Sequence, residues 1–270
     1  MKNKYYYTLI LILNFSIISA QYNNACFHTF EINSSYLNEA RKIHFYFQKD
    51  TSKLKNGIFF FCTDGQIVLK ENYIKIVDSL VNANIIHPIN LILVESNENF
   101  IENNIQLRNL DYIKPHNDTL NSSIINLRFN NHMNFFLLEI PEFIQSKFDI
   151  NVLKTNNYFF GTSNGAGFGV SLSSRNNSFI ENYILFSEAG GDIDNFDHNE
   201  RELKYYIAWG DKEPAPFRLS SLKKAQFFIE NGYDVALKEF SGGHNRIIWR
   251  NEFIDFLIKK FSINNSPLKK

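Results

Sequence analysis

Short apolar runs alternate with segments of helical spacing along most of this chain. Strand-like runs occupy residues 43–48, 57–62, 89–94, 158–160, 183–186, 205–209 and 235–240. Helix-like patterns cover residues 73–81, 135–148, 165–174, 219–229 and 247–261. This alternation predicts an α/β fold with a mostly parallel central sheet and helices on both faces.

The strand-like runs differ in kind. Residues 43–48 alternate as an edge strand should, whereas residues 57–62 form the continuous apolar run of a central parallel strand. Pro141 is expected to start or kink the helix over 135–148, because proline lacks an amide hydrogen. Residues 96–132 are polar, rich in Asn and irregular, so we expect a long excursion there.

Composition bounds the class of protein. The 270 residues include 44% hydrophobic residues and 27 Phe, enough for one α/β domain with a sizeable core. The 28 basic and 28 acidic residues balance, which argues against nucleic acid or an anionic membrane surface as a partner.

The N-terminus has the pattern of a signal peptide. Lys2 and Lys4 precede an apolar stretch over residues 5–18, and Ser19-Ala20 offers a cleavage site. An uncleaved anchor is the alternative, but the run is short for a span of about 20 residues. We therefore expect residues 1–20 to be removed near Ala20. The domain over residues 21–270 would then be secreted or periplasmic, with no stable membrane span.

Only two cysteines occur, Cys26 and Cys62. In an exported protein they could form a disulfide, and two unpaired buried thiols are the alternative. The sequence leaves both open.

The segment Gly161-Thr162-Ser163-Asn164-Gly165 joins a predicted strand to a predicted helix of small residues. This G-x-S-x-G pattern is typical of the nucleophile elbow of α/β-hydrolases. Glycines two positions from the serine allow strand and helix to approach closely around a strained turn. Ser163 is therefore a candidate nucleophile, and an acid and then a base should follow it along the chain.

Candidates for both partners follow later strands. His244 comes after the strand over 235–240 and two glycines, so it can reach the carboxyl edge of the sheet as a base. Asp211 and Glu213 both follow the strand over 205–209, and either could orient the imidazole. Spacing alone does not choose between them.

An oxyanion hole needs two backbone N–H groups. One is expected from Asn164, the residue after the nucleophile. The other is expected from Gly65 or Gln66, after the strand over 57–62, although an ordinary Asp-Gly turn is the alternative there. Such a site requires no metal or organic cofactor. Residues 96–132 would cross the active-site side of the sheet, and the pattern does not decide whether they form a lid.

Several segments together resemble one esterase family, which includes esterase D, S-formylglutathione hydrolase, feruloyl esterases and enterochelin esterases. Residues 34–43 are similar to its S-x-x-L-x-x-x-R-x-I opening, and residues 60–66 to its Y-L-L-D-G segment. Residues 108–112 resemble R-x-x-E-Y, with Asp111 for Glu. The elbow matches with Ala166 for a usual Gly, and residues 242–249 resemble G-G-H-D-x-x-x-W, with Asn245 for Asp.

The resemblance covers nearly the whole mature chain and implies an α/β-hydrolase fold with esterase activity. The family places its acid three residues after the glycine that ends the strand, which is Glu213 here. The segment over residues 210–214 is similar to the G-x-x-E-P of enterochelin esterases. The resemblance therefore favours Glu213 as the acid, with Asp211 in reserve.

The expected function is that of an exported serine hydrolase cleaving a carboxylic ester. Its partner would be a small-molecule or carbohydrate ester, either an acylated carbohydrate or a siderophore-type ester. Few arginines other than Arg246 and Arg250 lie near the motifs, which weighs against an anionic siderophore. The alternatives are a non-catalytic binding protein that keeps the fold and an acyltransferase.

Overall fold

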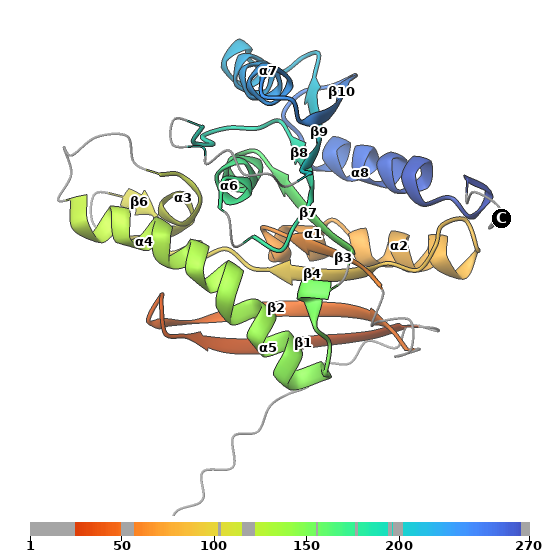
Figure 1. Cartoon of the computed structure of the whole chain (residues 1–270), viewed down its shortest axis with the longest axis horizontal. Helices are drawn as coiled ribbons and strands as arrows, with labels where there is room; N and C mark the ends of the chain where they lie inside the picture. Colours follow the sequence, from red (N-terminus) through yellow and green to blue (C-terminus); the bar gives the residue numbers. More distant parts are fainter. Residues whose placement is uncertain are drawn as a thin grey trace, which may run out of the picture.

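The computed structural model describes residues 25–49, 57–101, 104–114, 122–154, 156–175, 178–193, 196 and 202–265. The predicted signal peptide, residues 1–20, lies outside them. An eight-stranded sheet with the order β1-β2-β4-β3-β7-β8-β9-β10 runs through the molecule (Figure 1). The six strands β4, β3, β7, β8, β9 and β10 are mutually parallel, whereas β2 is antiparallel to both β1 and β4.

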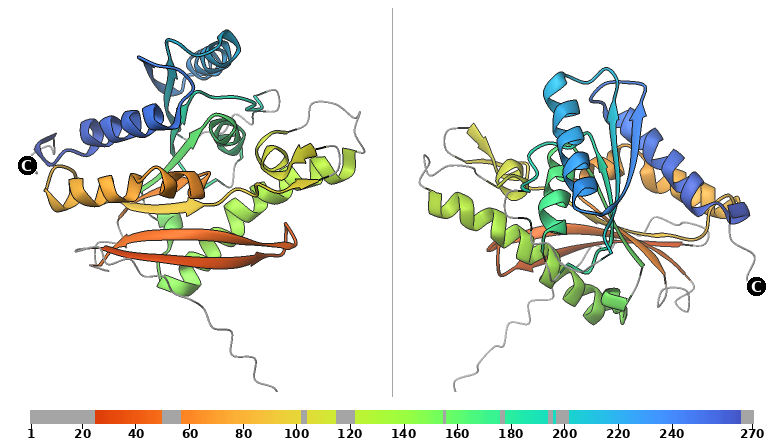
Figure 2. Two further views of the ribbon diagram at one scale, coloured as in Figure 1. Left: turned by 180° about the vertical axis from the view of Figure 1, so that it is seen from behind. Right: turned by 45° about the horizontal axis from the view of Figure 1, so that its top comes forward.

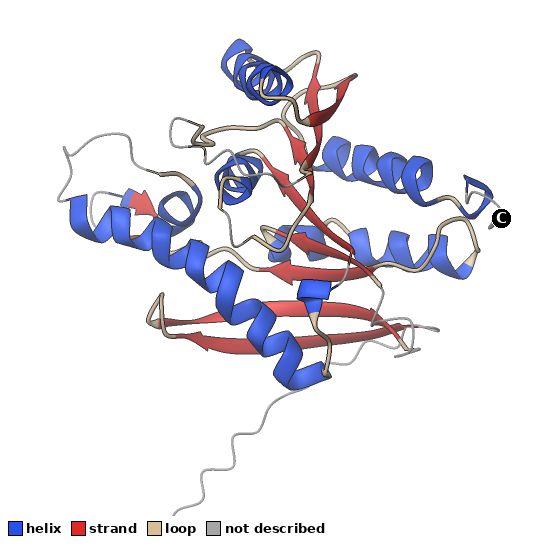
Figure 3. Ribbon diagram, in the orientation of Figure 1, coloured by secondary structure: helices blue, strands red, loops and turns tan. Residues whose placement is uncertain are grey.

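The elements follow the predicted alternation of strands and helices (Figure 3). The strands of the sheet are β1 (Ala25–Ser34), β2 (Glu39–Gln48), β3 (Ile58–Cys62), β4 (Asn90–Val94), β7 (Asn156–Thr162), β8 (Asn182–Phe186), β9 (Lys204–Gly210) and β10 (Asp234–Phe240). The helices are α1 (Gly65–Lys70), α2 (Tyr73–Asn82), α3 (Leu107–Tyr112), α4 (Ser122–Asn134), α5 (Ile140–Phe148), α6 (Asn164–Ser173), α7 (Ala215–Glu230) and α8 (Arg246–Phe261). Strands β5 (Phe100–Ile101) and β6 (Ile105–Gln106) form a separate antiparallel pair.

Alternate side chains of the central strands enter two hydrophobic cores. On β3, Phe59 and Phe61 face one core, and Phe60 and Cys62 face the other. Helices α1, α2 and α8 cover the second core, while α5, α6 and α7 cover the first (Figure 2). The predicted mostly parallel sheet with helices on both faces is confirmed.

The edge strand differs from the prediction. Residues 43–48 lie within β2, where all six side chains are buried, and β1 forms the edge instead. Both faces of β2 are covered because Phe45 packs against Phe143 and Phe148 of α5, while Tyr46 joins the opposite core. Residues 43–48 are therefore less exposed to solvent than the alternation of their side chains predicted.

Residues 96–132 are more regular than expected. They include the β5–β6 pair, α3 and most of α4, whose many Asn residues obscured its helical pattern. A π-helical segment, Phe135–Glu139, leads from α4 into α5, and Pro141 lies in the first turn of α5. Because proline cannot donate to the preceding turn, the wider π-helical turn accommodates it.

Both cysteines are free, Cys26 partly buried and Cys62 buried in β3. Burial raises the pKa of the Cys62 thiol far above its ordinary value, so the thiol stays protonated. Among the helices of the described ranges, none is long and apolar enough to cross a bilayer.

Candidate active site

The nucleophile elbow forms where β7 passes into α6. Ser163 has φ 55° and ψ −126°, a backbone conformation that residues other than glycine rarely adopt. The turn is tight, since a Cβ on Gly161 would lie 2.5 Å from the Gly165 carbonyl oxygen, and one on Gly165 would lie 2.4 Å from Thr63 Oγ1. The flanking glycines therefore permit a turn that presents Ser163 at the carboxyl edge of the sheet.

The structure brings Ser163, His244 and Glu213 together from three separate loops. Ser163 Oγ lies 3.0 Å from His244 Nε2, a hydrogen-bonding distance. On the other side of the ring, His244 Nδ1 lies 3.7 Å from Glu213 Oε1. This gap is longer than a hydrogen bond, and such contacts often tighten only when substrate binds. The Glu213 side chain is buried, while that of His244 is one-quarter exposed.

Asp211 has a different position. Its residue is exposed, and its Oδ1 accepts a hydrogen bond of 2.8 Å from the amide of Gly242. The Lys212 amide donates to the Gly242 carbonyl oxygen at 2.9 Å. These contacts tie the loop after β9 to the loop that carries His244. The Asp211 carboxylate thus binds the Gly242 amide and does not face the imidazole.

The loop that carries His244 passes directly into α8. The Asn245 side chain caps this helix by accepting a hydrogen bond of 2.9 Å from the Ile247 amide. Asparagine is as good an N-cap as aspartate, so the departure from the family's G-G-H-D pattern leaves the loop anchored.

The proposed oxyanion donors lie at the first turns of α1 and α6. The amides of Ile67 and Val68 already bond to the Asp64 carbonyl oxygen, which leaves those of Gly65 and Gln66 at this end of α1. The Gln66 side chain turns toward Ser96, so only its backbone could serve an oxyanion. Asn164 opens α6, and its side chain donates to Asn109 Oδ1 at 3.1 Å.

Helix α3 holds the segment before Gly65 through contacts that sequence reasoning missed. Arg108 makes two hydrogen bonds of 2.7 Å to the Asp64 carboxylate, and the Asp64 amide donates to the Tyr112 hydroxyl at 3.2 Å. Burial opposes the charge on Arg108, but Asp64 outweighs it and raises the pKa of the guanidinium. The only sequence signal was the R-x-x-E-Y likeness, which does not name Asp64 as the partner.

Solved structures of other proteins share the fold of this chain. BES protein from Bacillus cereus matches with a TM-score of 0.65 at 14% identity, over 86% of this chain and 93% of that one. An S-formylglutathione hydrolase from Agrobacterium tumefaciens matches with a TM-score of 0.60 at 12% identity, over 91% and 99%. The chain has the α/β-hydrolase fold. Enterochelin esterase from Shigella flexneri also matches, with a TM-score of 0.65 at 14% identity, over 89% of this chain and 59% of that protein.

The sequence itself gives no such match. No protein-family model matches the chain, and no curated protein is significantly similar to it. The likeness therefore lies in the α/β-hydrolase fold and not in overall sequence identity.

A pocket of about 260 Å³ opens over Ser163 and His244 at the elbow of this α/β-hydrolase fold. It is lined by Asp64, Ile67, Glu98, Gln106, Arg108, Thr162, Ser163, His244, Arg246 and Trp249. The Asp64–Arg108 pair contributes no net charge, so Glu98 and Arg246 are the exposed charges of opposite sign at the mouth. The pocket is mixed in charge and not basic.

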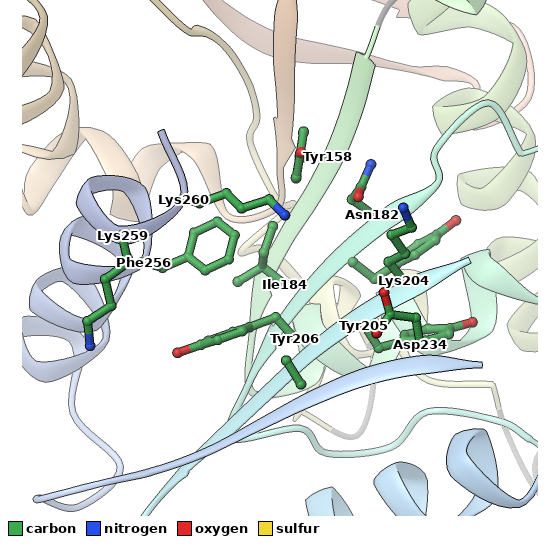
Figure 4. Close-up of a pocket in the computed structure, with 12 residues that line it drawn as sticks. Tyr158, Asn182, Ile184, Lys204, Tyr205, Tyr206, Asp234, Phe256, Lys259 and Lys260 are labelled. Atoms are coloured by element: carbon green, nitrogen blue, oxygen red, sulfur yellow. The ribbon is translucent and has the colours of Figure 1, made fainter. Parts of the chain in front are cut away.

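A second pocket, of about 250 Å³, lies at the amino ends of β8, β9 and β10 (Figure 4). Tyr206, Ile184 and Phe256 line its apolar part, and Lys204 and Lys260 lie beside it. This pocket contains none of the three residues that meet at the elbow. Within the described residues, no group of three or more His, Cys, Asp or Glu side chains could hold a metal ion.

Proposed function

We propose that this chain is a serine esterase in which Ser163 attacks the carbonyl carbon of a carboxylic ester. The observation that carries the proposal is the 3.0 Å contact of Ser163 Oγ with His244 Nε2 at a strained elbow. A hydroxyl is a weak nucleophile until a neighbouring base accepts its proton. Solved structures of esterases and hydrolases that share the fold lend further support.

The reaction divides into two steps. His244 Nε2 takes the proton of Ser163 as Oγ bonds to the ester carbon, and the carbonyl oxygen becomes an oxyanion. The amides of Asn164 and of Gly65 or Gln66 would donate to that oxygen. His244 then protonates the leaving alkoxide, so the alcohol departs and the acyl group stays on Ser163. In the second step water attacks the acyl-enzyme while His244 takes its proton, and His244 then gives that proton to Ser163 Oγ as the bond to the acyl carbon breaks and the carboxylic acid is released.

Glu213 is the better candidate for the acid. Its buried carboxylate faces His244 Nδ1, whereas the exposed Asp211 carboxylate is occupied by the Gly242 amide. A carboxylate behind the imidazole holds the required tautomer and stabilises the imidazolium that forms during attack. Asp211 would act by holding the two loops together.

The mixed charge of the pocket favours a neutral acyl group, such as that of an acylated carbohydrate, over a polyanionic iron complex. Asp64 neutralises Arg108, and the carboxylate of Glu98 also faces the pocket. Arg246 at the rim is the observation that favours the second candidate, a siderophore-type ester. A ferulic acid esterase and a siderophore hydrolase from Aspergillus nidulans have the same fold, so both substrate classes enter the screen.

Export follows from the predicted signal peptide and is part of the proposal. Expression of the full chain with its N-terminus intact should yield secreted or periplasmic protein whose first residue is Gln21. Sequencing the N-terminus of the processed protein tests both the cleavage near Ala20 and the domain over residues 21–270.

The decisive test is covalent labelling of Ser163. The wild-type protein should react with a fluorophosphonate probe and hydrolyse p-nitrophenyl acetate, and Ser163→Ala should do neither. Ser174→Ala is the matched control, because Ser174 Oγ bonds to the Ser171 carbonyl oxygen at the far end of α6. A wild-type protein that takes no label would be a non-catalytic binding protein. Preferential transfer of the acyl group to an added sugar would identify an acyltransferase.

A further inference from the structure

Ser187 lies behind the catalytic carboxylate, at the carboxyl end of β8. Its Oγ donates a short hydrogen bond to Glu213 Oε1 and accepts one of 2.7 Å from Trp249 Nε1. Its backbone has φ 53°, and its amide bonds to the Ala208 carbonyl oxygen at 2.7 Å. The three hydrogen-bonded residues, Ser187, Glu213 and Trp249, are all buried.

The direction of these hydrogen bonds follows from the groups themselves. An indole N–H can only donate, so Ser187 Oγ must accept from Trp249. The single hydroxyl hydrogen of Ser187 is then left for Glu213, whose Oε1 accepts it. Trp249 therefore sets the orientation of the Ser187 hydroxyl.

Glu213 has little other support for its charge. Over the described residues, Ser187 is the only group that donates a hydrogen bond to this carboxylate, and Oε2 has no partner. The titratable group that faces it is His244, while Arg218 donates to the Asp211 carbonyl oxygen instead. Without Ser187, no hydrogen bond from the described residues would hold this buried carboxylate in place behind the imidazole.

We propose that Ser187, oriented by Trp249, is a positioning residue that fixes the Glu213 carboxylate behind His244. The inference rests on the proposed esterase function. Trp249 serves the same unit a second time, because its ring packs edge-on against the His244 ring, with centroids 4.6 Å apart. Phe217 covers the imidazole at a centroid distance of 4.3 Å. The acid and the base are thus held by one buried tryptophan.

Three variants at these positions test the proposal by hydrogen-bond strength. We expect kcat on p-nitrophenyl acetate to fall more than tenfold in Ser187→Ala, less in Ser187→Cys, whose thiol is a weak donor, and severalfold in Trp249→Phe. KM should stay within about twofold in the two Ser187 variants, because Ser187 does not line the pocket over Ser163.

Ser173→Ala is the matched control, because Ser173 is fully buried and, within the described residues, its hydroxyl bonds only to the Val170 carbonyl oxygen, at 2.7 Å. Its kcat should stay at the wild-type value. A Ser187→Ala enzyme with wild-type kcat overturns the inference, as does an equal loss of kcat in Ser173→Ala. If Ser187→Ala does not fold, as judged by thermal melting, the kcat values of Trp249→Phe and Ser187→Cys decide in the same way. Failure of the proposed esterase function would be recognised by a different result, namely full activity of Ser163→Ala.

Discussion

The two sides of Ser163, the proposed nucleophile, are held by different forces. On one side, which we call the oxyanion wall, Asp64 is fixed by the Arg108 guanidinium and the Tyr112 hydroxyl. On the other, the histidine wall, Glu213 is fixed by Ser187 and Trp249, which are neutral donors. An arginine beside Glu213 would neutralise the charge that the proposed mechanism requires beside His244, whereas Asp64 has only to stay in place. Ion pairing therefore serves position, and neutral hydrogen bonding preserves a usable charge.

The oxyanion wall also has a second layer of charge. Asp111, fully buried on α3, pairs with Arg41 of β2 and with Arg128 of α4, the latter at 2.8 Å. Glu39 lies 2.6 Å from Arg41 and 3.0 Å from Arg128. These pairs join α3 to the antiparallel strands, so the position of Asp64 depends on distant parts of the chain.

The largest effect is expected on the histidine wall. Glu213→Gln keeps the shape of the side chain but removes the charge, so kcat should fall about a thousandfold while the protein stays folded. Steady-state kinetics with a thermal melt measures both. A loss below tenfold would assign the acid elsewhere, with Asp211 the next to test.

Substitutions in the oxyanion wall should lower the stability of the fold as well as the activity. Arg108→Met leaves the buried Asp64 carboxylate unpaired, and we expect unfolding to become easier by about 3 kcal/mol. In the double variant Asp64→Asn/Arg108→Met, the uncharged Asn still tolerates the left-handed φ of 54°. Chemical denaturation should show at least half of the lost stability restored. If the losses in unfolding free energy from the two substitutions simply add, the Asp64–Arg108 ion pair does not stabilise the oxyanion wall.

Asp211→Ala should have a smaller effect. The Gly242 amide loses its acceptor, and the expected loss is about 1 kcal/mol in unfolding free energy and less than tenfold in kcat. The comparison with Glu213→Gln separates loop tethering from charge support. Equal losses of kcat in the two variants would contradict the assignment of Glu213.

The smallest effects concern pH and have opposite signs on the two walls. Burial raises the pKa of Glu188, next to Ser187, so its contribution to stability is full below the ordinary value of 4.5 and is lost as pH rises through the raised value. Burial alone would raise the pKa of Glu39, but Arg128 and Arg41 lower it, so its contribution is lost as pH falls.

Glu188→Gln should therefore gain stability relative to the wild type as pH rises from about 4 toward 7, whereas Glu39→Gln should lose it over the same interval. Urea denaturation at several pH values measures the two slopes. Slopes of the same sign would show that the walls do not differ in this respect.

Patterns along the chain were enough for the central sheet and for the elbow. The runs over β3 and β4 are continuous and apolar because both of their faces are buried, and that signal is local. Strand β1 was missed because its polar residues alternate irregularly, and α4 because Asn-rich helices lack a clear apolar stripe. The fold class was correct because it depends on the order of elements more than on their ends.

The candidate site divides in the same way. The order of Ser163 and His244 along the chain could be predicted, because each follows a strand that ends at one edge of the sheet. The partners of Asp64 and Glu213 could not be predicted, since Arg108 lies 44 residues from Asp64 and Ser187 lies 26 residues from Glu213. Spacing gives candidates for an acid, but only the folded contacts separate a buried carboxylate from an exposed one.

The φ of 55° at Ser163 has a consequence for how such a chain can change over time. A glycine at this position would relieve the strained turn and make the folded state more stable, while removing the hydroxyl altogether. Selection for robustness alone would therefore erase the nucleophile. A serine in this conformation is therefore what a chain selected for its proposed chemistry would carry, whichever ester it cleaves.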